Sequence, residues 1–474
     1  MVVFSCLFSE VPETEAAGTR IGSPVGRLSV TIRKDEKMLK LQNVLEPNLF
    51  RDTFSYERIP AMKFMDETVP MRRPEQIWIT DTTFRDGQQA RPPYTVEQIT
   101  ELFKFMHRIS GTRGLIRQSE FFLYGQKDRE AVEACLSLGY DFPQVTAWIR
   151  ANKNDFELVK SLGLKETGIL TSCSDYHIFL KLKKNRRQTL DGYKEIVGAA
   201  LENGIVPRCH LEDLTRADIF GFVIPMINEL NEMCKGTGIK VKIRLCDTMG
   251  YGVPYANAAL PRGVPAIIQA ILNNTETASE QLEWHGHNDF HKVLANGVAA
   301  WLYGCSAVNG TFLGFGERTG NPPVEGLVFD WMAITGIHDG IDTTAITDMA
   351  AFYRDQIKYN IPPNYPFVGA DFNTTRAGVH ADGLTKNEEI YNIFDTEKFL
   401  KRPCKVAVSN TSGLAGIAYW IQSNLPKGKD IHKDNPGIVL IKNWIDEQYR
   451  AGRTTTISDE ELLSLIRENM PELL

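Results

Sequence analysis

The chain contains 474 residues, of which 43% are hydrophobic and 24% are charged, and its formal net charge at pH 7 is −6. A negative chain is not typical of nucleic-acid-binding proteins, which usually carry a basic surface. No apolar run approaches the ~20 residues of a membrane-spanning helix, and the apolar start lacks the basic segment of a signal peptide. We therefore expect a cytoplasmic protein that binds neither nucleic acids nor membranes.

The eight cysteines are spread along the chain without a C-x-x-C pair. This spacing does not suit a small disulfide framework. We expect reduced and mostly buried thiols, as in proteins of a reducing compartment.

The first 74 residues are predicted to form a tail and an arm. Residues 1 to about 45 are polar and aperiodic, which indicates a flexible tail, and Met38 is a possible biological start. The rest of this segment is aromatic but interrupted by prolines. We interpret it as an arm that lies on the body of the protein or on a partner subunit.

Residues 75–336 contain short β-branched or apolar runs that alternate with helix-like stretches. The runs lie at 77–84, 115–122, 142–149, 166–173, 205–213, 241–248, 281–289 and 306–314. Eight such units over about 260 residues predict a (β/α)8 TIM barrel. An open, doubly wound sheet is the alternative, but it rarely needs eight such regular units.

After residue 336 the pattern becomes helical. Helix-like segments occur at 347–359, 412–425, 437–452 and 458–470. We expect residues 337–474 to form a separate set of helical C-terminal subdomains.

The segment "HGHNDFH" contains a pair of histidines at the end of the seventh predicted strand. His285 and His287 lie two positions apart, so both side chains should point to the same face of a strand. Asp86, at the end of the first strand, would complete a set of two histidines and one carboxylate that binds a divalent metal with open positions. Such a pair alone is often only a polar strand end, but the other polar strand ends favour the metal site.

The residues that follow the pair are given lesser roles. Asn288 and Asp289 are expected to hold the two imidazoles in place as hydrogen-bond partners. His291 falls past the strand end, at the start of the next helix, and is interpreted as a bystander rather than a third ligand.

Several motifs together resemble the acyl-CoA condensing enzymes of the DRE-TIM metallolyase superfamily, which includes the 2-isopropylmalate, homocitrate, citramalate and Re-citrate synthases. The motifs are "DTTFRDGQQ", "TSCSDYH", "CDTMGYG", "HGHND" and "GERTGNPPVEGL". The resemblance covers about residues 75–395 and implies a barrel followed by helical subdomains. It also implies a Claisen-type condensation of acetyl-CoA with a 2-oxo acid, followed by hydrolysis of the thioester.

The resemblance assigns roles residue by residue. It implies a divalent metal held by Asp86, His285 and His287 with Asn321 close by; Mn²⁺ is expected first, with Mg²⁺ or Co²⁺ as alternatives. The implied catalytic residues are Arg85, Glu120, His380 and Tyr391. It also implies that Gln89 and Thr248 contact the substrate. The polar strand ends and strand alternation add His177, Arg208, Glu212 and Arg244 as further candidate substrate-binding residues.

Two of these assignments carry a further expectation. The context of Glu120, "RQSEFF", departs from the usual family pattern, so Gln118 is an alternative for its role. In this family the helical region lies over the barrel of the partner subunit. The resemblance therefore implies a homodimer in which His380 acts in trans.

Arginines inside the predicted barrel bear on the choice of 2-oxo acid. If Thr248 and Glu212 face inward, strand alternation places Arg244 and Arg208 inward as well. Buried arginines need acidic partners, for which Asp81 and Glu212 are candidates. The other interpretation is that they recognise a second carboxylate of the substrate.

A dicarboxylic substrate fits oxaloacetate or 2-oxoglutarate. The segments "RDGQQARPPYT", "RQSEFFLYG" and "HGHNDFHKVLAN" resemble the Re-citrate synthase branch of the family. We therefore expect citrate formation from oxaloacetate and acetyl-CoA. The alternatives are a homocitrate or 2-isopropylmalate synthase and, in other classes, an acyl-CoA lyase or a non-catalytic metal-binding barrel.

Overall fold

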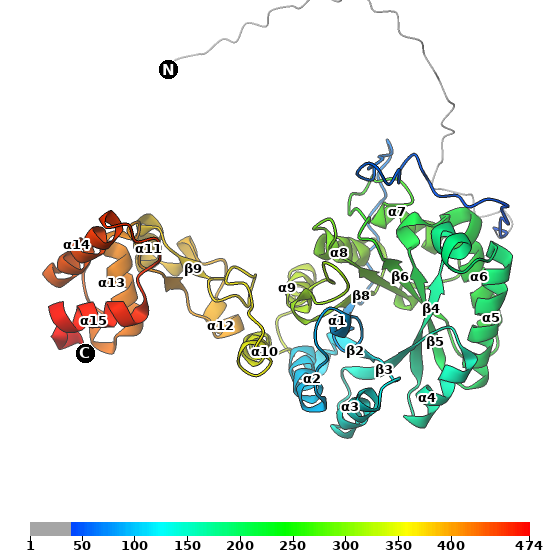
Figure 1. Ribbon diagram of the computed structural model, residues 1–474, viewed down its shortest axis with the longest axis horizontal. Helices are drawn as coiled ribbons and strands as arrows, with labels where there is room; N and C mark the ends of the chain where they lie inside the picture. Colours follow the sequence, from blue (N-terminus) through cyan, green and yellow to red (C-terminus); the bar gives the residue numbers. More distant parts are fainter. Residues whose placement is uncertain (1–38) are drawn as a thin grey trace, which may run out of the picture.

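The computed structural model describes residues 39–474. Most of the predicted tail, with Met38 and Cys6, lies outside the described residues. Figure 1 shows a barrel surrounded by helices and a second lobe formed by the C-terminal part of the chain.

The barrel consists of eight parallel strands that close in sequence order, from β1 next to β2 around to β8 next to β1. This arrangement confirms the predicted (β/α)8 fold and excludes the open sheet. The strands are β1 (Trp78–Asp81), β2 (Ile116–Phe121), β3 (Gln144–Ile149), β4 (Glu166–Ser172), β5 (Val206–Glu212), β6 (Lys242–Asp247), β7 (Leu282–Gly286) and β8 (Ala307–Gly310).

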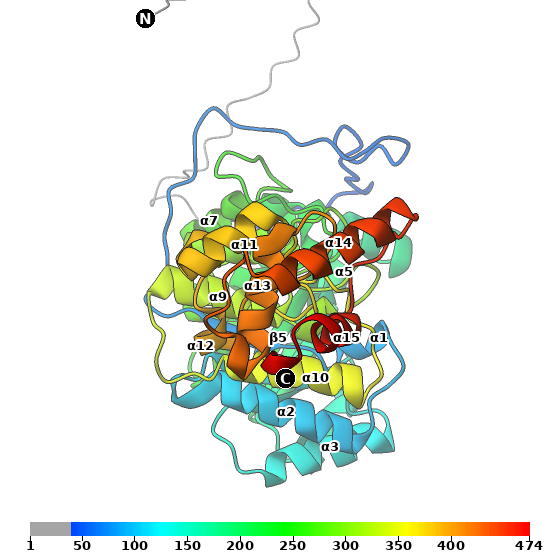
Figure 2. The same cartoon turned by 90° about the vertical axis from the view of Figure 1, so that its left-hand side faces the viewer.

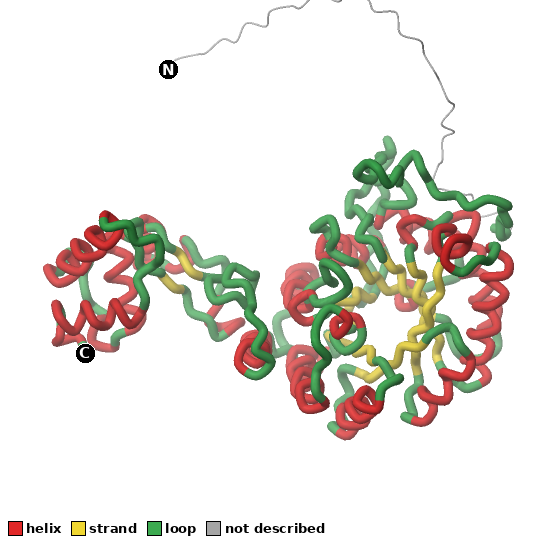
Figure 3. Tube along the Cα trace, in the orientation of Figure 1, coloured by secondary structure: helices red, strands yellow, loops and turns green. Residues whose placement is uncertain are grey.

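Helices surround the strands, as Figure 3 shows in red around yellow. They are α2 (Val96–Ser110), α3 (Gln126–Ser137), α4 (Phe156–Ser161), α5 (Arg186–Glu202), α6 (Ile224–Cys234), α7 (Val264–Asn274), α8 (Val293–Tyr303) and α9 (Val324–Thr335). The sequence of α2 explains its placement. Thr95 and Gln98 form a capping box at its start, and Ile99, Leu102 and Met106 form a buried stripe with helical spacing.

The inward-facing residues of several strands are charged rather than apolar. Outward-facing residues such as Leu245 and Trp284 are fully buried between strands and helices. In the register of β6 and β7, Arg244 lies beside Glu283. This barrel therefore departs from the usual filling of branched apolar side chains, and its interior can hold polar groups beneath the mouth.

Residues 39–76 run along the outside of the barrel and are attached through their backbone. The amide of Gln42 donates to the carbonyl of Gly221, and that of Met65 donates to Asn257. Leu45 and Tyr56 remain exposed on this segment, with 96% and 94% of their surface accessible. Contact with a partner subunit stays a prediction.

The C-terminal lobe contains mainly helices, with a short pair of parallel strands that the sequence pattern did not predict. Its elements are α10 (Thr344–Asp355), β9 (Thr374–Thr375), α11 (Gly378–Lys386), α12 (Thr396–Leu400), β10 (Lys405–Val406), α13 (Gly413–Asn424), α14 (Pro436–Arg450) and α15 (Asp459–Asn469). Helix α10 packs against α2, and α13 to α15 share a separate apolar cluster that includes Ile421, Ile441 and Ile466. Figure 2 shows this lobe in front of the barrel.

Two expectations from composition can be compared with the described residues. The cysteines from Cys135 to Cys404 are all buried and free of disulfides, as expected. Among residues 39–474, every helix is too short or too polar to cross a lipid bilayer.

Candidate metal centre and active site

Asp86, His285 and His287 come together at one end of the barrel. Their potential ligand atoms all lie within 4.8 Å of one another, and all three side chains are buried. Asp86 begins the short helix α1 (Asp86–Gln89) directly after β1, whereas His285 lies on β7. The strand ends at Gly286, so His287 lies one residue beyond it rather than on the strand as predicted, but its side chain still faces the same cluster.

Each imidazole is oriented by a hydrogen bond at Nδ1. His285 Nδ1 lies 2.8 Å from Oδ1 of Asn309, and His287 Nδ1 lies 2.8 Å from the carbonyl oxygen of Thr248. Both acceptors leave the Nε2 atoms available for a metal, and Nε2 of His287 lies 3.2 Å from Oδ2 of Asp86.

The predicted partners of the imidazoles were wrong. Asn288 accepts the amide hydrogen of Val293 at the start of α8, and Asp289 pairs with Arg318 at 2.8 Å. Asn288 thus contacts the start of α8, and Asp289 contacts the loop between β8 and α9. His291 is exposed and lies outside the metal-ligand cluster, as expected.

Asn321 completes one side of the cluster. Its Nδ2 donates to Oδ2 of Asp86 and, at 2.9 Å, to the carbonyl of Phe315. Its Oδ1 is buried and has no hydrogen-bond partner among the described residues. Gly316 allows this close approach, because a Cβ there would lie 1.9 Å from Nδ2 of Asn321.

The charge states of the cluster suit a cation. Burial, reinforced by the neighbouring His287, lowers the pKa of His285 to about 3, so its imidazole is neutral. Burial alone would raise the pKa of Asp86, but Arg85 and the hydrogen bond from His287 hold it well below its usual range. Burial lowers the pKa of His287, but the hydrogen bond and charge of Asp86 outweigh it and raise the pKa, so His287 would release a proton when a metal binds. Two imidazoles, a carboxylate and an orphaned amide oxygen then form a donor set that fits a divalent metal ion.

Arg85 connects the cluster to the barrel interior. Its Nη1 donates to Asp86 at 3.0 Å and its Nε donates to Glu120 at 2.9 Å, whereas Nη2 has no hydrogen bond to the described residues. Gln118 instead donates to Glu166 at 2.9 Å. Of the two candidates on β2, Glu120 is therefore the residue that contacts the site.

Arg208 and Arg244 are fully buried inside the barrel and have acidic partners. Arg208 pairs with Glu120 at 2.8 Å and with Glu166 at 3.0 Å. Arg244 pairs with Glu120 at 2.9 Å and with Glu283 at 2.8 Å. The expectation of carboxylate partners is confirmed, but Asp81 and Glu212 were the wrong candidates.

These ion pairs bear on the predicted substrate contacts. All three guanidinium nitrogens of Arg244 already donate to carboxylates, so this geometry does not support its role as a substrate ligand. For Arg208 the role stays a prediction. Sequence reasoning missed Glu283, although it lies two residues before His285, and strand alternation from that histidine places it inward.

Other predicted substrate-binding residues lie at the mouth. His177 Nδ1 lies 3.0 Å from Glu212, which also pairs with Lys181. Burial raises the pKa of Glu212, but the hydrogen bond and charge of His177 outweigh it and lower the pKa to about 2. Lys181 also borders a cavity of about 390 Å³.

Two further predicted substrate contacts are placed differently. Thr248 follows β6 and accepts the amide hydrogen of Asp213 at 2.8 Å through its hydroxyl. Gln89 ends α1 and is exposed. Both predicted contacts with the substrate stay predictions.

His380 and Tyr391 lie together in the C-terminal lobe rather than at the barrel. Their ring centroids are 4.2 Å apart, and His380 Nδ1 lies 3.1 Å from the hydroxyl of Thr375. Figure 1 places α11, which carries His380, in the lobe beyond α10 and α12. Within one chain, this pair therefore does not join the Asp86–His285–His287 cluster.

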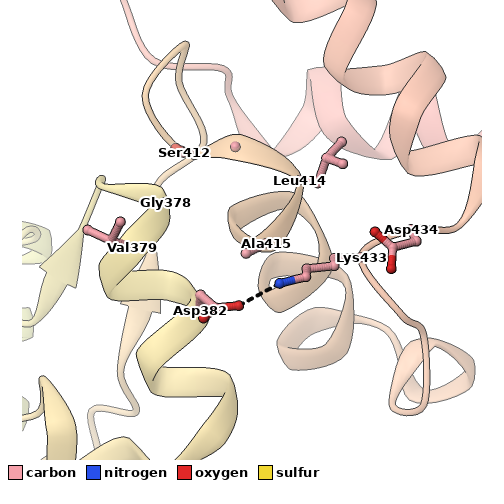
Figure 4. Close-up of a pocket in the computed structure, with 9 residues that line it drawn as sticks. Gly378, Val379, Asp382, Ser412, Leu414, Ala415, Lys433 and Asp434 are labelled. Carbon is pink, nitrogen blue, oxygen red and sulfur yellow. Dashed lines mark hydrogen bonds and ion pairs between the residues drawn. The ribbon is translucent and has the colours of Figure 1, made fainter.

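A cavity of about 400 Å³ opens beside α11 and is drawn in Figure 4. The starts of α11 and α13 border it at Gly378 and Gly413. Lys433 reaches Asp382 at 2.8 Å on its wall. The positive charge of Lys433 is thus already neutralised by the carboxylate of Asp382.

Comparison with protein families identifies the class of protein that this barrel and cluster represent. Residues 76–352 match the model of the HMGL-like family, and the chain belongs to that family.

Similarity to characterised relatives extends beyond the barrel. The chain is 56% identical over 436 residues to citrate (Re)-synthase of Syntrophus aciditrophicus, covering 92% of this chain and 69% of that protein. It is 53% identical over 437 residues to citrate (Re)-synthase of Clostridium kluyveri, covering 92% and 96%. A 2-phosphinomethylmalate synthase of Streptomyces hygroscopicus is 35% identical over 437 residues, covering 91% and 98%.

Proposed function

We infer that this chain condenses acetyl-CoA with oxaloacetate and hydrolyses the resulting thioester to citrate and CoA. The observation that carries this inference is its high identity, over most of its length, to two citrate (Re)-synthases. The buried Asp86–His285–His287 cluster at the barrel mouth is the kind of site that this chemistry needs.

The cluster supplies the ligands for a divalent cation, which we propose to be Mn²⁺. Asp86, His285 and His287 would hold it, with Oδ1 of Asn321 as a further donor. Bound there, the cation would supply Lewis acidity toward the carbonyl of a 2-oxo acid.

Arg85 would act on the same carbonyl group. Its position is fixed by Glu120 and Asp86, and its free Nη2 can approach the oxygen that becomes an alkoxide. A preorganised positive charge stabilises that developing negative charge without reorganisation. Gln89, exposed at the end of α1, would help to position the 2-oxo acid.

His380 is the proposed base that removes a proton from the methyl group of acetyl-CoA. Its Nδ1 faces Thr375 and its ring packs on Tyr391, which orients the imidazole for proton transfer through Nε2. The resulting carbon nucleophile attacks the 2-oxo acid, and water then hydrolyses the thioester.

We propose that His380 reaches the metal centre of a second copy of the chain. Its lobe stands away from its own barrel, and apolar side chains near it are exposed, among them Val379 at 73% and Ile393 at 67%. A homodimer would cover this surface and complete the site in trans.

A substrate panel tests the proposed reaction. Purified protein with Mn²⁺ and acetyl-CoA is assayed for released CoA against oxaloacetate, 2-oxoglutarate, 2-oxoisovalerate and pyruvate. We expect the highest kcat/KM with oxaloacetate and citrate as the product. A preference for 2-oxoglutarate would instead indicate a homocitrate synthase, and a preference for 2-oxoisovalerate a 2-isopropylmalate synthase.

A further inference from the structure

Asn309 on β8 stands between a metal ligand and the charged interior of the barrel. Its Oδ1 faces Nδ1 of His285 at 2.8 Å, and its Nδ2 lies 3.0 Å from Oγ1 of Thr80 and 3.3 Å from the carbonyl oxygen of Thr80. The Asn309 side chain is completely buried. A side-chain amide can rotate by half a turn, so the direction in which it accepts depends on its other partners.

The other hydrogen-bond partners of Asn309 define which atom of its amide faces His285. Arg244 donates through Nε and Nη2 to both oxygens of Glu283, and Nε of Arg208 lies 3.7 Å away, so Glu283 is a paired carboxylate that can only accept. The Thr80 hydroxyl therefore donates its single hydrogen to Glu283. Its oxygen, like its backbone carbonyl, is then an acceptor for Nδ2 of Asn309.

With its nitrogen directed to Thr80, Asn309 presents only an oxygen to His285. Nδ1 of His285 must then donate a hydrogen to that oxygen, so an imidazole that binds a metal keeps its hydrogen on Nδ1 and directs the lone pair of Nε2 to the metal cluster. His287 differs in this respect, because the backbone carbonyl of Thr248 fixes its tautomer directly.

The same chain of contacts reaches a second metal ligand. Arg244 donates to both oxygens of Glu283 and, through Nη1, to Glu120 at 2.9 Å. Glu120 in turn accepts from Arg85, which donates to Asp86. The barrel interior thus connects Asp86 to His285 through charged groups and hydrogen bonds alone.

We propose that Asn309, Thr80 and Glu283 are positioning residues of the metal centre, which together select the tautomer of His285 that binds the cation. The proposal rests on the metal site proposed above but not on the choice of 2-oxo acid. If the proposal is right, metal binding depends on a hydrogen-bond network between strands whose residues do not contact the ion.

The test measures Mn²⁺ binding by electron paramagnetic resonance in the full-length protein at fixed pH, without substrates. Asn309→Leu should weaken Mn²⁺ binding by about 10- to 100-fold, as expected for loss of an outer-shell partner. Thr80→Val should weaken binding, and Thr80→Ser should restore it.

A matched control separates this effect from the loss of any buried amide. Asn228 on α6 is also buried, and its Nδ2 donates to the carbonyl of Asn274 outside the barrel. Asn228→Leu should leave Mn²⁺ affinity unchanged. If Asn309→Leu binds Mn²⁺ like wild type, or if Thr80→Val equals Thr80→Ser, the proposal is wrong.

The tautomer itself can be observed in metal-free protein. ¹⁵N NMR of histidine-labelled chain, assigned with His285→Ala, should show a protonated Nδ1 in wild type and a tautomer mixture in Asn309→Leu. Weakened metal binding without this change would contradict the proposed cause. If His285→Ala itself keeps wild-type Mn²⁺ affinity, the metal site has failed; if only Asn309→Leu does, the positioning role alone has failed.

Discussion

Oδ2 of Asp86 and Nε2 of His287 lie 3.2 Å apart, although 201 positions separate the two residues in the sequence. The contact forms because β1 and β7 are both parallel strands whose carboxyl ends meet at the same end of the barrel. Arg85 supplies a compensating positive charge on the other oxygen of the carboxylate. Asp86 is thus held between a cation on one side and an imidazole on the other.

Replacement of Asp86 tests the metal site directly. Asp86→Asn keeps the shape of the side chain but removes the negative charge that a divalent cation needs. Because outer-shell changes already cost about 10- to 100-fold in metal affinity, loss of this ligand should weaken Mn²⁺ binding by at least that factor. Metal content after gel filtration and CoA release should both fall, and full turnover in this variant would refute the assignment.

The alternation of strand-like and helix-like segments was enough to predict the barrel and the metal-ligand cluster. Each predicted run contains one strand, and the ends of parallel strands converge, so Asp86, His285 and His287 were expected to meet. The residues beyond a strand end were less predictable: Asn288 and Asp289 lie in a loop whose direction depends on its contacts with α8 and Arg318. No strand periodicity constrains such residues.

The charged residues inside the barrel show a second limit of prediction from the sequence. A glutamate such as Glu283, beside the apolar Trp284, is compatible with a solvent-facing position when one strand is considered alone. Alternation from His285 gives its inward direction, but its partner becomes clear only from the register of the neighbouring strand, which places Arg244 beside it. Asn309 was missed for the same reason, because its importance depends on contacts from two other strands.

Mixing two inactive variants tests the action of His380 in trans. His380→Ala and Asp86→Asn are each expected to be inactive as homodimers. When subunits are exchanged, half of the dimers become mixed and each mixed dimer has one intact site, so about a quarter of wild-type activity should return. CoA release after co-refolding or co-expression measures this recovery.

The same experiment distinguishes action of His380 on the partner's barrel from action on the barrel of its own chain. If His380 served the barrel of its own chain, every site in a mixed dimer would lack one residue and no activity would return. As a control, a mixture of His380→Ala with Tyr391→Phe should not regain activity through intact sites, because both changes lie in the same lobe.

The buried ion pairs predict a large effect on stability. Arg244→Met removes the guanidinium that donates to both oxygens of Glu283 and one of the buried partners of Glu120, which should lower the free energy of unfolding by about 3–5 kcal/mol. Arg187 offers a control, since it pairs with Asp191 and Glu229 but its side chain is 43% exposed. Arg187→Met should cost no more than about 1 kcal/mol. Urea unfolding followed by circular dichroism compares the two, and equal losses would contradict this account.

Glu325 predicts a dependence of stability on pH. It lies buried at the start of α9, accepts the amide hydrogen of Leu313 at 3.2 Å, and has an Oε1 without a partner among the described residues. Burial raises the pKa of Glu325 from 4.5 to about 7. Between these values the unfolded chain loses the proton while the folded chain keeps it, so the contribution of Glu325 to stability falls as pH rises from 4.5 to 7 and stays low above 7.

Glu325→Gln should remove this pH-dependent loss of stability, because the amide is neutral at every pH. Relative to wild type, the variant should gain stability between pH 4.5 and pH 8, by an amount on the order of 3 kcal/mol at 1.36 kcal/mol per pKa unit. Comparison with wild type cancels the similar contribution of Asp81, whose pKa burial also raises to about 7. Urea unfolding at both pH values measures the difference, and a gap between variant and wild type that does not change with pH would show that Glu325 is ionised in the folded protein.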